Sequence, residues 1–386
     1  GLSGDGVSKT ARFLSDRVVG IEINPRIVEL QANELIPYNG NSYKDIEVHV
    51  MDGRSYLEET QEKFDIVTLM NAHGARGQAA GSAPSPEYLF TLEAFESYFE
   101  HMTDNGILNI EEPINRPRRE PPVWKMLVTI RQALLNIGYT NPEKHCFVFQ
   151  WRTRTNNYIQ TVVKKTPLTA ADNTNLQRWL DDVDRVRQIE AAQQRKLGPI
   201  RTKTTILHMP DAGYDTYYSR LLAGQVSDDV LDARNLTVTT DNQPFHFDVD
   251  PGHPNIKKAY VRALLMSLLL LPFFIAFLGS HRRELRRLLP FVLAVMLTGL
   301  GYFLIEVVLI ERYEIFIGAP VVTFSTILGT LLIFSGLGSL WSGRATPARA
   351  YLALAAVFLM LISQQFMPNL FHLGAALPLG AKVLLV

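Results

Sequence analysis

A glycine turn and an acid at the end of an expected strand stand close together near the start of the chain. Gly4, Asp5 and Gly6 precede an expected helix over residues 7–15, and the apolar stretch that begins at Arg17 ends in Glu22. Glycines in such a turn let the backbone pass close to a ligand at the helix N-terminus. A carboxylate at the end of the second strand can accept both ribose hydroxyls of a nucleoside. The pair therefore favours nucleoside binding over the alternative, a strand-end acid that faces water.

A second acid follows the next expected strand. The stretch Ile46–Met51 ends in Asp52 and Gly53, and an expected helix follows from Tyr56 onward. Asp52 could accept a hydrogen bond from an adenine amino group. It could also cap the helix, a role that Asp or Ser commonly fills, and the two roles are compatible.

The order of the expected elements shows what would position these side chains. Strands alternate with helices over residues 1–150, which predicts an α/β fold with a doubly wound, Rossmann-like sheet and right-handed crossovers. The loop Asn71–Pro86 after the strand Phe64–Leu69 would lie at the ligand-binding edge of that sheet. The soluble domain is expected over residues 1–250. Its further elements are a helix over Leu92–Met102, a strand over Gly106–Glu111, a helix over Trp124–Ile137, paired strands over Phe147–Trp151 and Tyr158–Lys164, a helix over Asn175–Lys196 and a helical insertion over Gly213–Leu231.

The second part of the chain, residues 258–386, predicts a helical transmembrane domain with the lipid bilayer as its partner. Runs of this length and apolarity can cross about 30 Å of hydrocarbon at 1.5 Å per residue. Four spans are expected, and a fifth would begin near Leu370. The four are Tyr260–Leu278, Leu289–Ile310, Ala319–Trp341 and Ala348–Phe366.

Basic residues between the spans give an orientation. Arg282, Arg283, Arg286 and Arg287 lie in an expected turn over 281–287, and with two later arginines they exceed the four basic residues on the opposite side. The excess favours a cytoplasmic location for this side and a periplasmic soluble domain.

Glu306 lies inside an apolar span. It is either a proton or substrate site or, as the more ordinary alternative, a helix–helix hydrogen bond or ion pair.

Composition excludes several classes of protein. The 386 residues carry 38 basic and 38 acidic side chains, a neutral balance that argues against a nucleic-acid partner. The single cysteine, Cys146, excludes an intrachain disulfide and a cysteine-based zinc site. No Gly-Lys-Ser/Thr sequence follows the glycine turn, so hydrolysis of nucleoside triphosphates is not expected. No spacing of histidines predicts a metal site.

Both ends of the chain fall inside expected elements, which suggests an internal portion of a longer protein.

The motifs resemble those of spermidine synthase-like proteins, which have the class I S-adenosylmethionine-dependent methyltransferase fold. The resemblance is carried by Gly4-Asp5-Gly6, Val19–Pro25, Val48–Arg54, Phe64–Val67, Tyr88–Phe95 and Asp104–Leu108. It is closer to bacterial membrane proteins in which that domain is fused to transmembrane helices, through Thr240–Phe245, Leu304–Glu306, Gly318–Pro320 and Phe334–Ser339. The resemblance implies a location in the bacterial inner membrane.

The resemblance also implies a cofactor site. S-Adenosylmethionine or its decarboxylated form would contact Glu22 through the ribose and Asp52 through the adenine, with Gly4, Asp5, Gly6 and Gly53 supplying backbone contacts. In aminopropyltransferases of the family, two acids follow the fourth strand and deprotonate the attacking amine. Here Asn71 and His73 stand in that stretch. A degenerate or altered transferase is therefore expected. The alternative is a non-catalytic docking subunit that associates with other membrane subunits.

Overall fold

The computed structural model describes residues 11, 15–70, 87–114, 120–152, 157–193, 204–249, 261–262, 265–266, 268, 282–317, 320–342, 346, 355, 357–359, 362, 377 and 379–385. The chain divides into two compact units. Unit 1 comprises Gly1–Gly20, Arg26–Val48 and Gln61–Ala259, and unit 2 comprises Ile21–Pro25, His49–Thr60 and Tyr260–Val386.

Unit 1 contains a five-stranded mixed sheet. Its spatial order is β3-β4-β6-β5-β7. β3 and β4 are parallel, whereas β4 with β6, β5 with β6, and β5 with β7 are antiparallel. The strands are β3 (Phe64–Met70), β4 (Met102–Pro113), β5 (Cys146–Arg152), β6 (Asn157–Lys164) and β7 (Thr205–His208). The prediction of an α/β fold is confirmed, and the five described strands of this sheet form a mixed sheet.

The antiparallel part follows from a short connection. β5 and β6 pair from Arg152 with Asn157 to Cys146 with Val163, so only residues 153–156 join them. A connection this short joins antiparallel strands, because a parallel pair needs a crossover of a dozen or more residues. The two expected strands at this hairpin are confirmed. β7 was not predicted.

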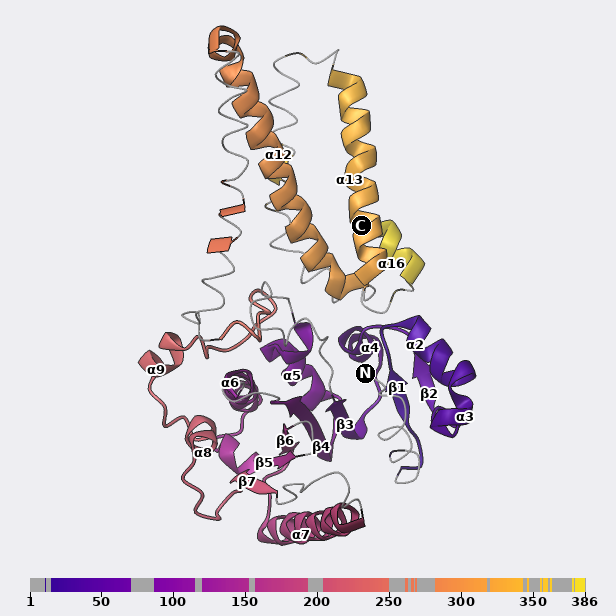
Figure 1. Cartoon of the computed structure of the whole chain (residues 1–386), viewed down its shortest axis with the longest axis vertical. Coiled ribbons are helices and arrows are strands. Elements are labelled where there is room, and N and C mark those ends of the chain that lie inside the picture. The colour runs from indigo at the N-terminus through magenta and orange to yellow at the C-terminus, as the bar shows by residue number, and fades with distance from the viewer. Residues whose placement is uncertain are drawn as a thin grey trace. The chain divides into compact units, whose positions relative to one another are not determined.

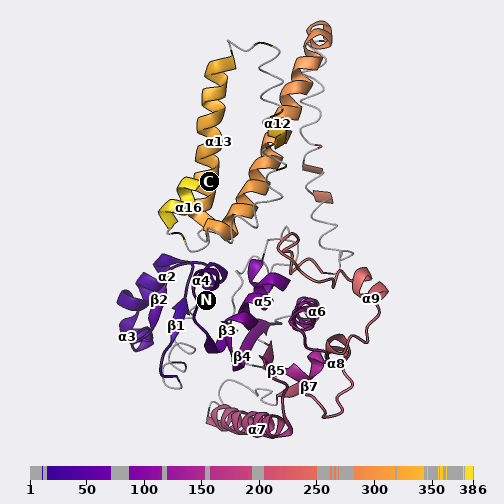
Figure 2. The same cartoon turned by 180° about the vertical axis from the view of Figure 1, so that it is seen from behind.

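Helices cover both faces of this sheet. Figures 1 and 2 show α7 on one side and α5 with α6 on the other. On the α7 side, Phe147 and Phe149 of β5 pack with Leu180 of α7 and with Leu168 and Met209. The helices of unit 1 beside the sheet are η2 (Tyr88–Phe90, 3₁₀), α5 (Leu92–Glu100), α6 (Pro121–Asn136), η3 (Pro142–His145, 3₁₀), α7 (Ala170–Gln193), α8 (Tyr217–Leu222) and α9 (Asp228–Ala233).

The buried side chain of Lys125 in α6 forms hydrogen bonds with the last described segment of unit 1. Lys125 is only 4% exposed, and its Nζ donates to the carbonyls of Phe245 (2.9 Å) and Asp248 (3.1 Å). Burial lowers the pKa of Lys125 to about 8, and the Asp248 charge opposes that shift. The segment also contacts the start of α5, because the amide of Asp241 donates to Glu93.

This lysine predicts a pH dependence of stability. The folded pKa of about 8 lies below the ordinary value of 10.5, so between these values the unfolded chain holds the proton more tightly. Stability is expected to rise from pH 8 to 10.5, by at most about 3 kcal/mol. Denaturation midpoints of the wild type and Lys125→Met across this range would measure the effect. Parallel profiles for the two proteins would show that Lys125 is not responsible.

A separate two-stranded sheet is formed by β1 (Val19–Ile21) and β2 (Glu47–His49). The chain between them is helical in three consecutive segments. α2 (Pro25–Glu29) continues into a π-helical turn, η1 (Leu30–Glu34), before α3 (Ile36–Asn39). Pro37, in the first turn of α3, has no amide to donate and therefore favours a new helix start. Gly40 ends α3 with φ of 61°, a conformation that glycine adopts without strain.

The described helices of unit 2 include α4 (Gly53–Glu59), α12 (Arg282–Ile317), α13 (Pro320–Ser342) and α16 (Leu379–Leu385). α12 and α13 are the long helices drawn in orange in Figure 1. They pack through a shared cluster of Leu309, Tyr313, Phe316 and Ile317 of α12 with Ile327 of α13. At the end of α16, Lys382 is buried and lies 2.6 Å from a carboxylate oxygen of Glu59 in α4.

One helix among the described residues, Val322–Leu340, is long and apolar enough to cross a membrane, and Met296–Ile310 is a shorter apolar stretch. The expected turn over 281–287 is wrong for residues 282–287, which are helical because Arg, Glu and Leu form helices readily. Most of the expected spans Tyr260–Leu278 and Ala348–Phe366, and the expected start of a fifth near Leu370, lie outside the described residues. The four-span bundle and the domain boundary stay predictions.

Candidate functional site

The carboxylate of Glu22 is held in place directly after β1. Glu22 is 8% exposed, its Oε1 accepts from the amide of Asn24 at 3.0 Å, and its own amide donates to the carbonyl of His49 at 3.1 Å. The second bond ties the residue to the end of β2. A strand-end acid that simply faces water, the alternative interpretation, would be exposed. Glu22 is therefore a buried carboxylate with a fixed orientation.

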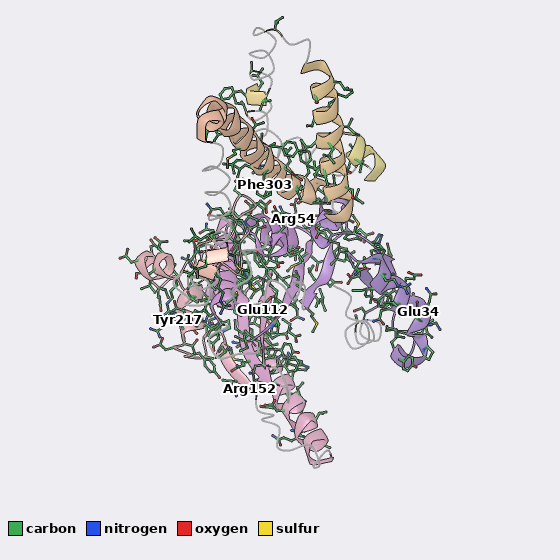
Figure 3. The ribbon with its side chains drawn as sticks, turned by 45° about the horizontal axis from the view of Figure 1, so that its top comes forward. Glu34, Arg54, Glu112, Arg152, Tyr217 and Phe303 are labelled. Atoms are coloured by element: carbon green, nitrogen blue, oxygen red, sulfur yellow. The ribbon has the colours of Figure 1, made fainter. Side chains whose placement is uncertain are left out.

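Asp52 caps a helix, which is one of the two compatible roles expected for it. It is the N-cap of α4, and its Oδ1 accepts from the amides of Arg54 (2.9 Å) and Ser55 (3.1 Å). Burial raises the pKa of Asp52, while these bonds act in the opposite direction. The helix begins at Gly53, not at Tyr56 as expected, because the cap satisfies its first amides. Arg54, labelled in Figure 3, lies in the first turn and is buried.

The cap gives a prediction for Asp52. Replacement by alanine removes the acceptor of two backbone amides and is expected to destabilise α4 by about 1 kcal/mol. Asn keeps an acceptor, so Asp52→Asn is expected to lose less. Amide hydrogen exchange of Arg54 and Ser55 would measure this. Equal protection in the wild type and Asp52→Ala would contradict the capping role.

The structure brings Glu22 and Asp52 to the same end of one strand pair. Each follows the carboxyl end of its strand, β1 or β2, and the two strands are neighbours. Gly53 lies beside Asp52 as the first residue of α4. The other expected contacts, Gly4, Asp5 and Gly6, lie outside the described residues, and so do Asn71 and His73.

Two buried acids in unit 1 were not singled out from the sequence. Glu111 and Glu112 lie just before Pro113, the last residue of β4, and are 4% and 3% exposed. Glu111 is in register with Met70, the last residue of the parallel strand β3 and the residue before Asn71. Glu112, labelled in Figure 3, pairs with Ile159 of β6. The sequence signal is the pair of adjacent acids that follows the stretch Gly106–Ile110.

Glu306 lies within α12, and its side chain is partly buried. It falls in the apolar stretch Met296–Ile310. Among the described residues, no group of three or more His, Cys, Asp or Glu side chains could hold a metal ion.

Comparisons with known proteins give only distant similarities. No family model and no curated protein matches the chain. Among solved structures, it is similar to a probable spermidine synthase from Corynebacterium glutamicum, with 15% identity over 42% of this chain and 54% of that one and a TM-score of 0.31. It is also similar to the spermidine synthase of Thermotoga maritima, with 16% identity, 44% and 54% coverage, and the same TM-score. A third is a spermidine synthase in complex with the transition-state analogue AdoDATO, with 14% identity, 61% and 66% coverage, and a TM-score of 0.31.

The chain spans about half the length of the first two of these structures. Similarities at these TM-scores do not establish a function for this chain.

Proposed function

We propose that this chain is a membrane-bound, spermidine synthase-like protein that binds S-adenosylmethionine or its decarboxylated form through Glu22 and Asp52. The observation that supports it is the placement of these two acids after neighbouring strands, each held by backbone amides. Glu22 would accept from the ribose hydroxyls and Asp52 from the adenine amino group. Because these acceptors are already oriented, binding would cost little side-chain ordering.

Group transfer is proposed to be altered or lost. An amine must lose its proton before it can attack the cofactor, and a carboxylate is the usual base in this chemistry. Asn71 has an amide instead of a carboxylate and does not accept that proton.

The membrane part of the proposal is supported by α13 and α12. Val322–Leu340 would cover about 28 Å at 1.5 Å per residue, close to the thickness of a hydrocarbon core. Large apolar side chains on both helices are exposed, among them Leu340 (80%), Phe334 (68%) and Phe303 (59%), the last labelled in Figure 3. Exposing such apolar surfaces to water is energetically unfavourable, whereas the lipid of a bilayer accommodates them.

We expect the protein to stay in the membrane fraction after an alkaline carbonate wash. A reporter fused after Gly279 would give the side of the soluble domain.

Calorimetric titration of the detergent-purified protein with S-adenosylmethionine and with decarboxylated S-adenosylmethionine tests the binding proposal. Saturable heat with at least one of them is expected. No heat with either would refute the proposal and favour the docking subunit.

A separate assay tests the loss of transfer. With decarboxylated S-adenosylmethionine and putrescine, we expect no release of methylthioadenosine. Release of methylthioadenosine would contradict the proposed loss of transfer.

A further inference from the structure

Unit 1 contains a cavity that the proposed nucleoside site does not use. It has a volume of about 390 Å³ and lies among η3, β7 and α8. Its wall includes His208 from β7 and Ser219 from α8, and exposed residues such as Asp211 and Tyr214 form its opening to solvent. The volume lies within the range of small-molecule sites, about 300–1,000 Å³.

A chain of hydrogen bonds in this wall orients a serine hydroxyl. The Oγ of Ser219 lies 3.0 Å from Nδ1 of His208, and Nε2 of His208 lies 2.8 Å from the carbonyl oxygen of Glu143. A carbonyl only accepts, so the neutral ring carries its proton on Nε2. Nδ1 then has the lone pair and accepts from the hydroxyl of Ser219. This is the order of a nucleophile, its base and a group that orients the base.

A neighbouring hydroxyl supports the same geometry. Thr216 donates from Oγ1 to the carbonyl of Leu207 at 2.5 Å. Its Oγ1 also accepts from the amide of Ser219 at 3.1 Å, which fixes the serine backbone at the start of α8. The Oγ of Ser219 also lies 3.2 Å from Oγ1 of Thr216, so the hydroxyl lies between the imidazole and the threonine. Ser219 is itself part of the cavity wall.

We propose that Ser219 is a nucleophile toward small carboxylic esters, with His208 as its base. Ser219 Oγ forms a bond to the ester carbonyl carbon as its proton moves to Nδ1 of His208. The bond to the leaving alcohol then breaks, and the alcohol takes that proton. Water, deprotonated by the same nitrogen, hydrolyses the acyl-serine and restores the hydroxyl.

The charges at the cavity come from Glu143 and Lys144 on η3, Asp211 and Asp215 before α8, and Arg220 on α8. Lys144 and Arg220 are the groups that could stabilise the developing oxyanion.

His208 has the protonation state that a general base needs. His208 is 4% exposed, and burial lowers its pKa, while the carbonyl and the charge of Glu143 oppose the shift. At neutral pH, the ring is therefore uncharged and can take a proton.

A fluorophosphonate probe tests the proposal on the full chain in detergent, with the modified residue mapped by mass spectrometry. We expect one adduct on Ser219, formed as the phosphorus–fluorine bond breaks. Ser219→Ala should remove it, and His208→Gln should slow labelling by about 100-fold, the scale of a lost general base. Ser227→Ala is the matched control, because Ser227 is an exposed helix-capping serine with no side-chain cap bond, and it should leave labelling unchanged.

The labelling rate of the wild type against pH gives a readout that does not depend on any variant folding. It should be constant above neutral pH and fall only below the ordinary histidine pKa. Absence of an adduct on Ser219 in wild-type protein with an intact thermal transition would overturn the proposal. So would labelling that increases steadily with pH like that of an unassisted alcohol.

Discussion

Replacing Glu22 with alanine is expected to weaken binding of S-adenosylmethionine by about 100-fold. The carboxylate would accept two hydrogen bonds from the ribose, and bonds to a charged group contribute about 1.5–3 kcal/mol each. The lower end of that sum for two bonds, about 3 kcal/mol, corresponds to a loss on the order of 100-fold in Kd. Calorimetric titration of the variant against the wild type measures the change.

Two variants separate ligand contact from structural damage. Glu22→Gln keeps an acceptor for the amide of Asn24 but loses the charge, so an intermediate loss of about tenfold is expected. Glu29→Gln alters an exposed carboxylate that pairs with Arg26 at 2.7 Å, and binding should not change. Retained affinity in Glu22→Ala would place the nucleoside elsewhere.

Replacing Phe147 with alanine is expected to cost unit 1 about 3–5 kcal/mol of stability. The ring is fully buried in the cluster between β5 and α7 and lies 5.4 Å from the ring of Phe149. Its removal leaves a cavity that the flanking strands β6 and β7 do not fill without moving. Tryptophan fluorescence during chemical denaturation would measure the change, since Trp124, Trp151 and Trp179 all belong to unit 1.

Tyr38→Ala is the matched control for this core substitution. Tyr38 is also aromatic but is 85% exposed, so a change within about 0.5 kcal/mol is expected. Equal destabilisation by the two substitutions would mean that the β5–α7 cluster is not the core of unit 1.

The elements that the sequence predicts best are those with a clear apolar pattern. Phe147–Trp151 and Tyr158–Lys164 are dense in β-branched and aromatic residues, and their hairpin was expected. β7 was missed because Thr205–His208 is short, and its pairing with β5 depends on a contact distant in sequence. Leu30–Glu34 has no local sequence signal that separates the π-helical turn of η1 from an ordinary α-helix.

The candidate site was predictable only in part. Glu22 and Asp52 follow strands, so their common edge could be inferred from the order of elements. The burial of Glu111 and Glu112 depends on β6 lying antiparallel beside β4, which no local pattern predicts. The approach of His208 to Ser219 depends on the turn that returns α8 to β7, and scattered single residues give no signal of it.

The most direct measurement is an experimental structure of the protein with S-adenosylmethionine bound. We expect the Glu22 carboxylate within hydrogen-bond distance of both ribose hydroxyls and Asp52 beside the adenine amino group, at the carboxyl ends of β1 and β2. A nucleoside bound at another place, with Glu22 still turned to the amide of Asn24, would contradict the proposed site.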